Sequence, residues 1–289
     1  MRVTLPLMYG VATRDILRKQ ENINRLSRNL SSGLRLHNPH DDPEAWGRSL
    51  NVQDTLHRMQ RYESNLDFAT NMLSMADSGL NHVHDLLIRA KEIGMAANTP
   101  NSQEEKKAYV EELDQLVKEL ALTTSERYNG QNVFAGKPIW NEGTQRWEWE
   151  PGRPSGDDLQ VPLEDGLPPM TVPCDLSGIL PDLMNVLEDL KTHIENEDSS
   201  NITTALASLD TSMEQIRGLS STVGARLKSL ERRKETLNTL TAHRQEHLSE
   251  LRDTDFLEAI SSLQANQIAL EAALKSSLAL KDLSLVRYL

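Results

Sequence analysis

Apolar residues recur every seven positions along two long segments of the chain. In the first segment a series of mostly small residues follows the large ones at a distance of three, which is typical of a packed helix seam. The large residues are Val52, Met59, Leu66, Leu73, Leu80 and Leu87, and the companions are Tyr62, Ala69, Ala76, Val83 and Ala90. This spacing predicts one helix from about residue 43 to about residue 96, roughly 80 Å long at ~1.5 Å per residue.

The second segment keeps the same period over about 50 residues. Its apolar positions are Ile202, Leu209, Ile216, Val223, Leu230, Leu237 and Leu251, with an interruption at Arg244. Ser220, Lys234 and Thr241 place polar side chains at the companion positions. Two long helices with one apolar stripe each are not stable alone in water, so we expect them to pack along each other. The polar seam positions would help to set their register.

Shorter helices fit around this pair. Ser102 and Glu105 form the pattern of a capping box, and the helix that follows is expected to end near Asn129-Gly130. A further helix is predicted from apolar residues at steps of three and four, namely Leu180, Leu183, Leu187, Leu190 and Ile194. The predicted fold is therefore mainly α, a long antiparallel coiled-coil-like helical rod.

Both ends of the chain are amphipathic and separate from the rod. Asp255 with Glu258 resembles a second capping box, which indicates a break just before it. Helices of a few turns need a partner to be stable, so we expect residues 1–41 to form an assembly helix that pairs with residues 254–289. The expected assembly residues are Ile16, Ile23, Leu30, Phe256, Ile260, Leu263, Leu270, Leu274, Leu283, Leu285 and Leu289.

Residues 137–176 hold seven of the twelve prolines and interrupt the helical pattern. Trp140, Trp147 and Trp149 alternate across a strand–turn–strand pattern, which predicts a small β-rich outer insertion. These tryptophans could line a ligand site, but a miniature core of their own is the favoured interpretation. The rod then consists of residues 42–136 and 177–253 on either side of the insertion.

Composition narrows the function. The net charge of −12 argues against a general nucleic-acid binder. The first 36 residues carry seven Lys/Arg against two Asp/Glu, which indicates a basic arm or, more simply, a solvated helix face. Cys174 is alone, so no internal disulfide is expected. The pattern predicts no membrane insertion and no secretory signal, so any export would use another route.

The stretch HNPHDDPEAW contains the first candidate site. His37, His40, Asp41 and Asp42 could be metal ligands. The same residues are explained by a hinge, because Pro39 disfavours helix at the residue before it and Asp42 is a good N-cap before Pro43. We therefore expect Pro39, Asp41, Asp42 and Pro43 to form a hinge.

The stretch HRQEH is the second candidate. His243, Glu246 and His247 match the H-x-x-E-H pattern of inverted zinc proteases. Both histidines flank the heptad seam, only 42 residues follow, and no cleft is predicted around them, so the metalloprotease hypothesis is not favoured. No Gly-rich phosphate loop or nucleophile elbow is present. We expect no catalytic, cofactor or metal residues, and a structural assembly subunit is the favoured class because the terminal helices need partners.

The ends also resemble a known family. MRVTLPLMY and QENINRLSRNLSSGLRLHNPHDDPEAW at the start are similar to the N-terminus of the bacterial flagellin superfamily. Pro39 and the Asp41-Asp42-Pro43 form are closer to its hook–filament junction proteins (hook-associated protein type 3) than to flagellin, which usually has alanine after the two aspartates. YNG-x-NVFAG, SSTVGARLKSLE and the end of the chain carry the resemblance further. It covers residues 1–136 and 177–289 but not the insertion.

The resemblance implies a structural subunit of the flagellum, exported unfolded through the flagellar channel without a cleaved signal. The implied assembly is a homo-oligomeric ring between the hook side and the filament, built through terminal helices. The implied partners are a neighbouring hook-associated protein, flagellin and a flagellar export chaperone. A short flagellin is the alternative.

Overall fold

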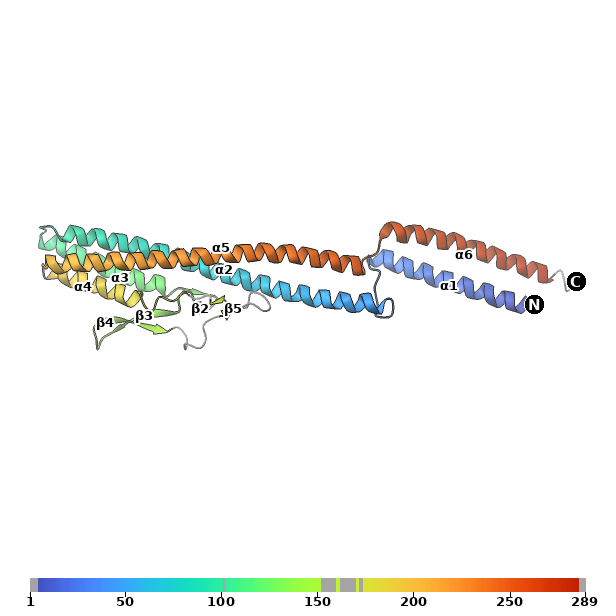
Figure 1. Ribbon diagram of the computed structural model, residues 1–289, viewed down its shortest axis with the longest axis horizontal. Helices are drawn as coiled ribbons and strands as arrows, with labels where there is room; N and C mark the ends of the chain where they lie inside the picture. Colours follow the sequence, from blue (N-terminus) through green and yellow to red (C-terminus); the bar gives the residue numbers. More distant parts are fainter. Residues whose placement is uncertain (1–4, 101, 152–159, 162–169, 172–173, 286–289) are drawn as a thin grey trace. The chain divides into compact units, whose positions relative to one another are not determined.

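The computed structural model describes residues 5–100, 102–151, 160–161, 170–171 and 174–285, which form six α-helices and three two-stranded antiparallel sheets (Figure 1). The prediction of a mainly α fold is confirmed. The chain divides into two compact units, Met1–Arg58 with Leu240–Leu289 (unit 1) and Met59–Thr239 (unit 2). Helices α2 (Pro43–Ala97) and α5 (Ser199–Arg252) contribute to both units.

The two long helices have the predicted extents, 55 residues for α2 and 54 for α5. Within unit 2 the heptad positions of both helices are buried except Met59, which is partly buried, and Leu73, Leu80 and Leu209 are fully inaccessible to solvent. The companion positions Ala69 and Ala76 are buried as well, and their small side chains leave room for close approach. The seam predicted from the seven-residue period is therefore the core of this unit.

Two of the polar seam positions, Lys234 and Ser220, pair with acidic residues of the other long helix. Lys234 donates to Asp67, with 2.6 Å between Nζ and Oδ1, and the Ser220 hydroxyl donates to Asp77 at 3.1 Å. From Asp67 to Asp77 the residue number on α2 increases, while that of the partner on α5 decreases from 234 to 220. This is the order that an antiparallel pair of helices requires. Such polar contacts discriminate against a shifted register, in which the charged groups would lose their partners.

Helix α3 (Gln103–Thr124) begins at the predicted capping box, with Ser102 and Glu105 bonded in both directions. Its end was predicted wrongly, because the helix stops at Thr124, five residues before Asn129. The hydroxyls of Thr123, Thr124 and Ser125 each donate to the carbonyl four residues earlier, and such side-chain bonds compete with continuation of the helix.

Asn129 and Gly130 instead form the turn of a small hairpin between β1 (Arg127–Tyr128) and β2 (Gln131–Asn132). Both turn residues have positive φ, 51° and 80°, as a two-residue turn of this kind requires. An Asn-Gly pair is among the strongest local signals for a hairpin, so the sequence contained the information that places this turn.

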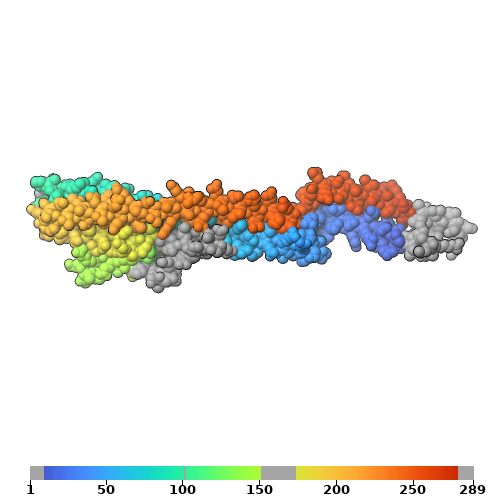
Figure 2. All heavy atoms as spheres, viewed as in Figure 1, coloured from blue at the N-terminus to red at the C-terminus, as the bar shows by residue number. Residues whose placement is uncertain are grey.

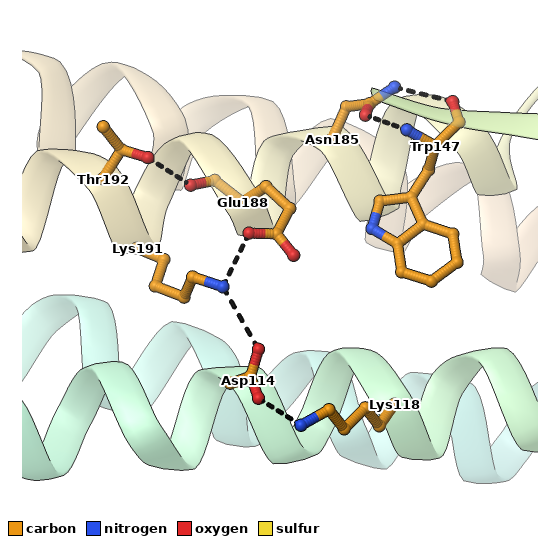
Figure 3. A network of polar contacts seen from close by, with 7 residues as sticks. All are labelled: Asp114, Lys118, Trp147, Asn185, Glu188, Lys191 and Thr192. Atoms are coloured by element: carbon orange, nitrogen blue, oxygen red, sulfur yellow. Dashed lines mark hydrogen bonds and ion pairs between the residues drawn. The ribbon is translucent and has the colours of Figure 1, made fainter. Parts of the chain in front are cut away.

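Helix α4 (Leu180–Glu195) packs on α3 and buries the predicted apolar stripe. Lys191 bridges the two helices, with Nζ 2.7 Å from Glu188 and 3.2 Å from Asp114, whose other carboxylate oxygen accepts from Lys118 (Figure 3). Partial burial acts to lower the pKa of Lys191, but its two carboxylate partners outweigh it and the pKa is raised. The lysine therefore stays charged between the two helices.

The other face of α4 anchors the hairpin of β3 (Gly136–Asn141) and β4 (Arg146–Pro151). The Asn185 side chain bonds to both backbone groups of Trp147, accepting from its N–H at 2.8 Å and donating to its carbonyl at 3.1 Å (Figure 3). Arg146 forms an ion pair with Asp189 at 3.1 Å. The hairpin is thus fixed to the helices by its backbone as well as by its side chains.

Trp140 faces Trp147 across this hairpin, and Pro138 faces Trp149, so the three tryptophans share one face as predicted. They do not form a separate core. Trp147 and Trp149 pack against the helical core of unit 2, while Trp140 contacts Trp147 edge-on and is 42% exposed. The strands β5 (Gln160–Val161) and β6 (Met170–Thr171) form a further pair, and the rest of residues 152–173 lies outside the described part of the chain.

A small residue at Gly136 allows this docking, because a Cβ there would collide with the Glu150 carbonyl oxygen and the Trp149 ring. We expect Gly136→Ala to displace the Trp face from α4 and to shift tryptophan fluorescence toward that of exposed indole. Helical circular dichroism should change little, since the heptad seam lies elsewhere. Gly178→Ala is the control, because a Cβ at that position meets no atom within 4 Å. Unchanged fluorescence in the Gly136 variant would contradict this account of the docking.

Candidate assembly site at the terminal helices

Helices α1 (Leu5–Ser32) and α6 (Phe256–Leu285) pack side by side in unit 1 (Figure 2). Ile16, Ile23 and Leu30 of α1 are partly buried, as are Leu263 and Leu270 of α6. Ala259 is 5% exposed, and its small side chain lies where the two helices are in contact. These predicted assembly residues therefore form a seam within one chain.

Other predicted assembly residues of α6 face solvent. Phe256, Ile260 and Leu274 are exposed by 51%, 45% and 46%. Three further apolar residues of α6 are even more exposed, namely Leu257 (83%), Ile268 (70%) and Leu278 (62%). We call these six residues the apolar outer face. Phe256, Ile260 and Leu274 are about half covered within unit 1, whereas most of the surface of Leu257, Ile268 and Leu278 is exposed. Clustered exposed apolar side chains of this kind mark an interaction site.

Three of the predicted assembly residues lie at the C-terminal end of the chain. Leu283 and Leu285 lie on the last turns of α6, where only the backbone is described, and Leu289 lies outside the described residues. The predicted assembly residues did not include Leu257, Ile268 or Leu278. Their signal in the sequence was the presence of apolar residues on more than one stripe of the same helix, which an intramolecular seam alone does not need.

Two linkers in unit 1 connect this helix pair to α2 and α5, and they are bonded to each other. Gly33 ends α1 with a positive φ of 75°, which favours glycine, and its carbonyl accepts from Thr254 at 2.9 Å. The Arg35 backbone N–H donates to the Arg252 carbonyl at 2.6 Å, and its guanidinium donates to the Leu251 carbonyl at 2.9 Å. We call this pair of linkers, residues 33–42 and 253–255, the joint. Its contacts are specific, unlike those of a freely flexible hinge.

The two aspartates of the predicted hinge organise the joint. Asp41 accepts from the backbone N–H groups of His37 and Asn38 at 3.0 and 2.9 Å. Asp42 caps α2, accepting from Ala45 N–H at 3.0 Å directly before Pro43 at the first helical position, and its carboxylate lies 3.6 Å from Arg35. Pro39 lies in the turn before them.

The histidines of this stretch bond to neighbouring protein groups. His37 Nε2 lies 3.1 Å from the buried Asn29 side chain, and His40 lies 3.6 Å from Asp41. The metal-site alternative would need these side chains to converge with free lone pairs. Among the described residues, no three His, Cys, Asp or Glu side chains are grouped as metal ligands.

Hydrogen bonds to the charged carboxylates lower both pKa values below the usual 3.8. For Asp41 the main cause is the bond from Asn38 N–H, followed by that from His37, and for Asp42 it is the bond from Ala45 N–H. A depressed carboxyl pKa stabilises the folded form above the ordinary pKa. This contribution is lost as the pH falls through the lowered pKa, so the joint should loosen as the solution is acidified below the ordinary carboxyl pKa.

We expect Asp41→Ala to loosen the first linker, because two backbone N–H groups lose their acceptor. Amide exchange at His37 and Asn38 should accelerate severalfold at neutral pH, and protease cleavage between residues 33 and 42 should increase. Asp54→Ala is the control, since Asp54 is 71% exposed and forms an ion pair with Arg58 of its own helix. Equal exchange rates at His37 and Asn38 in the wild-type and Asp41→Ala proteins would exclude this capping role.

The HRQEH stretch lies on the exposed end of α5. His243 and His247 are close to Glu246 and Glu250 at 3.8 and 3.4 Å, which are contacts between neighbouring turns of one helix. The histidine side chains are 70% and 46% exposed. The geometry is that of a solvated helix face, and the described residues place no third ligand beside the two histidines, as a catalytic zinc would need.

A pocket of about 390 Å³ lies beside the joint in unit 1. Asn29, Asp41, Thr254 and Glu258 are among its lining residues, so it is polar and lies between the end of α1 and the start of α6. No helix in the described part of the chain combines the length and apolarity needed to cross a membrane.

Known families match both ends of the chain. Residues 6–138 match the bacterial flagellin N-terminal helical region, and residues 206–289 match the bacterial flagellin C-terminal helical region. The first match covers α1, α2, α3, the β1–β2 hairpin and the start of β3, and the second covers most of α5 and all of α6. The segment between them contains the rest of the β-rich insertion and α4.

The individual relatives include both flagellins and hook-associated proteins. The chain is 24% identical to flagellar hook-associated protein 3 of Escherichia coli K12 over 322 aligned positions, which cover 99% of this chain and 98% of that protein. It is 23% identical to a flagellin of Halalkalibacterium halodurans, with 84% and 82% covered. Among solved structures, a putative flagellar hook-associated protein from Vibrio parahaemolyticus superposes with a TM-score of 0.66 at 16% identity, over 74% of this chain and all of that one.

Proposed function

We propose, since the chain belongs to the bacterial flagellin superfamily, that it is the structural subunit that joins the flagellar hook to the filament. It is then an extracellular component of the flagellum, exported by the flagellar system. The observation that carries the proposal is the similarity to hook-associated protein 3 of Escherichia coli along almost the whole of both chains. The likeness to the Vibrio parahaemolyticus structure supports the fold.

The terminal helices provide the means of assembly. The six residues of the apolar outer face of α6 are 45–83% exposed within the chain, and full burial of one such side chain contributes roughly 1.5–3 kcal/mol relative to full exposure. Packing of α1 and α6 of neighbouring copies would provide that burial. We propose that residues 1–41 and 254–289 act as this assembly region, and that the joint fixes their direction.

The partners follow from this position in the flagellum. We propose a homo-oligomeric ring that contacts a neighbouring hook-associated protein on one side and flagellin on the other, after delivery by an export chaperone. Residues 137–176 form an outer insertion in this scheme. The role needs no catalysis, and the exposed HRQEH stretch takes no part in it.

Deletion of the gene tests the proposal. Cells that lack it should make hooks without filaments and release flagellin into the medium, as seen by electron microscopy and by immunoblotting of the culture fluid. Expression of the chain from a plasmid should restore filaments. Normal filaments in the deletion strain would exclude the junction role.

A short flagellin is the second candidate, because the Halalkalibacterium halodurans relative is a flagellin. The same deletion distinguishes the two. A flagellin mutant would have hooks with a junction but no filament, and the purified chain would polymerise alone into long filaments. A junction subunit would stop at a ring and would leave flagellin intact in the medium.

A further inference from the structure

We propose that a row of arginines on the outer side of α1 binds an acidic row at the end of α5 in a neighbouring copy of the same chain. The inference rests on the proposed function, which brings unit 1 of neighbouring copies together. It adds a second, electrostatic contact to the apolar one of α6, and it assigns a role to the basic N-terminal segment.

The basic row consists of Arg14, Arg18, Arg25 and Arg28. Spacings of four, seven and three residues place them on one side of α1, and all four are exposed. Glu21 is the one acidic residue within this row. Arg14 donates to the Gly10 carbonyl of its own helix, and none of the four takes part in an ion pair with another described residue. Helix geometry places Arg14 and Arg18 on the side of α1 opposite Ile16, Ile23 and Leu30, whereas Arg25 also lines the pocket beside the joint.

The acidic row consists of Glu246, Glu250 and Asp253. Spacings of four and three residues place them on one side of the last turns of α5 and the residue that follows it. Glu246 and Glu250 are 73% and 70% exposed, and their neighbours are His243 and His247. Asp253 accepts from the Ser249 hydroxyl at 2.5 Å. No Lys or Arg pairs with them within the described residues.

The overall charge of unit 1 favours a second copy as the partner. The unit contains 14 Lys/Arg and 13 Asp/Glu, so it is nearly neutral, while unit 2 has 17 against 30. Opposite charges within unit 1 are segregated onto different helix faces. A unit whose positive and negative charges are nearly equal in number, but lie on different faces, can be complementary in charge to another copy of itself.

The spacing of the two rows also matches. Arg14 and Arg18 are one helical turn apart, as are Glu246 and Glu250. Arg18 and Arg25 are seven residues apart, as are Glu246 and Asp253, which is about 10 Å along a helix. Two helices lying side by side could therefore form successive pairs without a change of pitch.

Charge reversal on each row tests the contact in cells that lack the wild-type gene. Arg14→Glu with Arg18→Glu should abolish filaments, and so should Glu246→Arg with Glu250→Arg. The protein that carries all four changes should restore them, because the pairs form again with reversed sign. The control is Gln20→Glu with Asn24→Glu, which adds charge at the same spacing on a different exposed side of α1 and should leave filaments intact.

Each outcome has a distinct meaning. If the arginine variant assembles normally, the inference is wrong, while the proposed function stands as long as the wild-type plasmid restores filaments. If the arginine variant fails but the glutamate variant assembles, the basic row binds another acidic surface, such as one on unit 2, and the pairing proposed is wrong. If the four-fold variant fails although it is exported and folded, direct pairing is also excluded.

Cross-linking provides a readout that does not depend on motility. Cys174 is the one cysteine of the chain and is buried, so Cys174→Ser gives a cysteine-free background. Copies with Arg18→Cys and copies with Glu250→Cys, expressed together, should give a disulfide-linked dimer in isolated flagella upon oxidation. Asn24→Cys with Glu250→Cys should not. Absence of the first dimer in flagella that contain both proteins would exclude the contact.

Discussion

Replacing Leu73 by aspartate is expected to unfold unit 2 or to reduce its free energy of unfolding by at least ~4 kcal/mol. Leu73 is fully inaccessible in the seam between α2 and α5, so the new carboxylate would be buried without a partner. Losses of this size arise from unpaired charges in a core. Thermal melting followed by circular dichroism, together with urea titration, measures the effect.

Ser74→Asp is the matched control, because Ser74 is the next residue on α2 and is exposed. It should change the free energy of unfolding by no more than about 0.5 kcal/mol. Equal melting temperatures for the two variants would show that the seam is not the core of the folded chain. The seven-residue period would then have misidentified the buried face of α2.

The long helices were predictable from sequence because a single physical requirement acts along their whole length. Every seventh residue of α2 must face α5, so the apolar period extends far enough to be unmistakable. Local chemistry also placed the helix starts at Asp42 and Ser102, where a side-chain oxygen accepts a backbone N–H. The helix caps depend on residues close together in the chain, and the seam depends on a regular period. Both kinds of pattern can be recognised in a single sequence.

Contacts between distant segments were not predictable in the same way. The docking of Trp147 on Asn185 joins residues 38 positions apart and uses backbone groups of the strand. The joint likewise depends on backbone bonds from Arg35 and Thr254. Any residue can supply such groups, so they leave no pattern in the sequence. Only the prolines and aspartates around the joint indicated a special structure.

The candidate site shows the same limit. Leu263 and Leu274 were both predicted to be assembly residues, yet the first lies in the seam with α1 and the second faces solvent. A helix with apolar residues on several sides has no single seam that the sequence could specify. Which side packs within the chain is decided by α1, and the other side becomes available to neighbours.

The apolar outer face leads to the prediction with the largest effect on assembly. Leu257→Ser with Ile268→Ser is expected to leave the free monomer as stable as the wild type, because these side chains are 83% and 70% exposed in the chain itself. Between subunits the two leucine-sized groups would contribute several kcal/mol, at roughly 1.5–3 kcal/mol each. Cells with this variant should therefore export the protein but carry hooks without filaments.

Two controls separate assembly from folding in this experiment. Gln264→Ser changes a polar residue on the same helix and should leave both stability and filaments intact. Leu263→Ser removes an inward-facing side chain, so it should weaken the pairing of α1 with α6 and speed amide exchange along α1. Suppose instead that the double serine variant melts at a lower temperature than Leu263→Ser. The apolar outer face would then be part of the monomer's own core. The loss of filaments in the double serine variant would then result from unfolding and not from a missing contact between subunits.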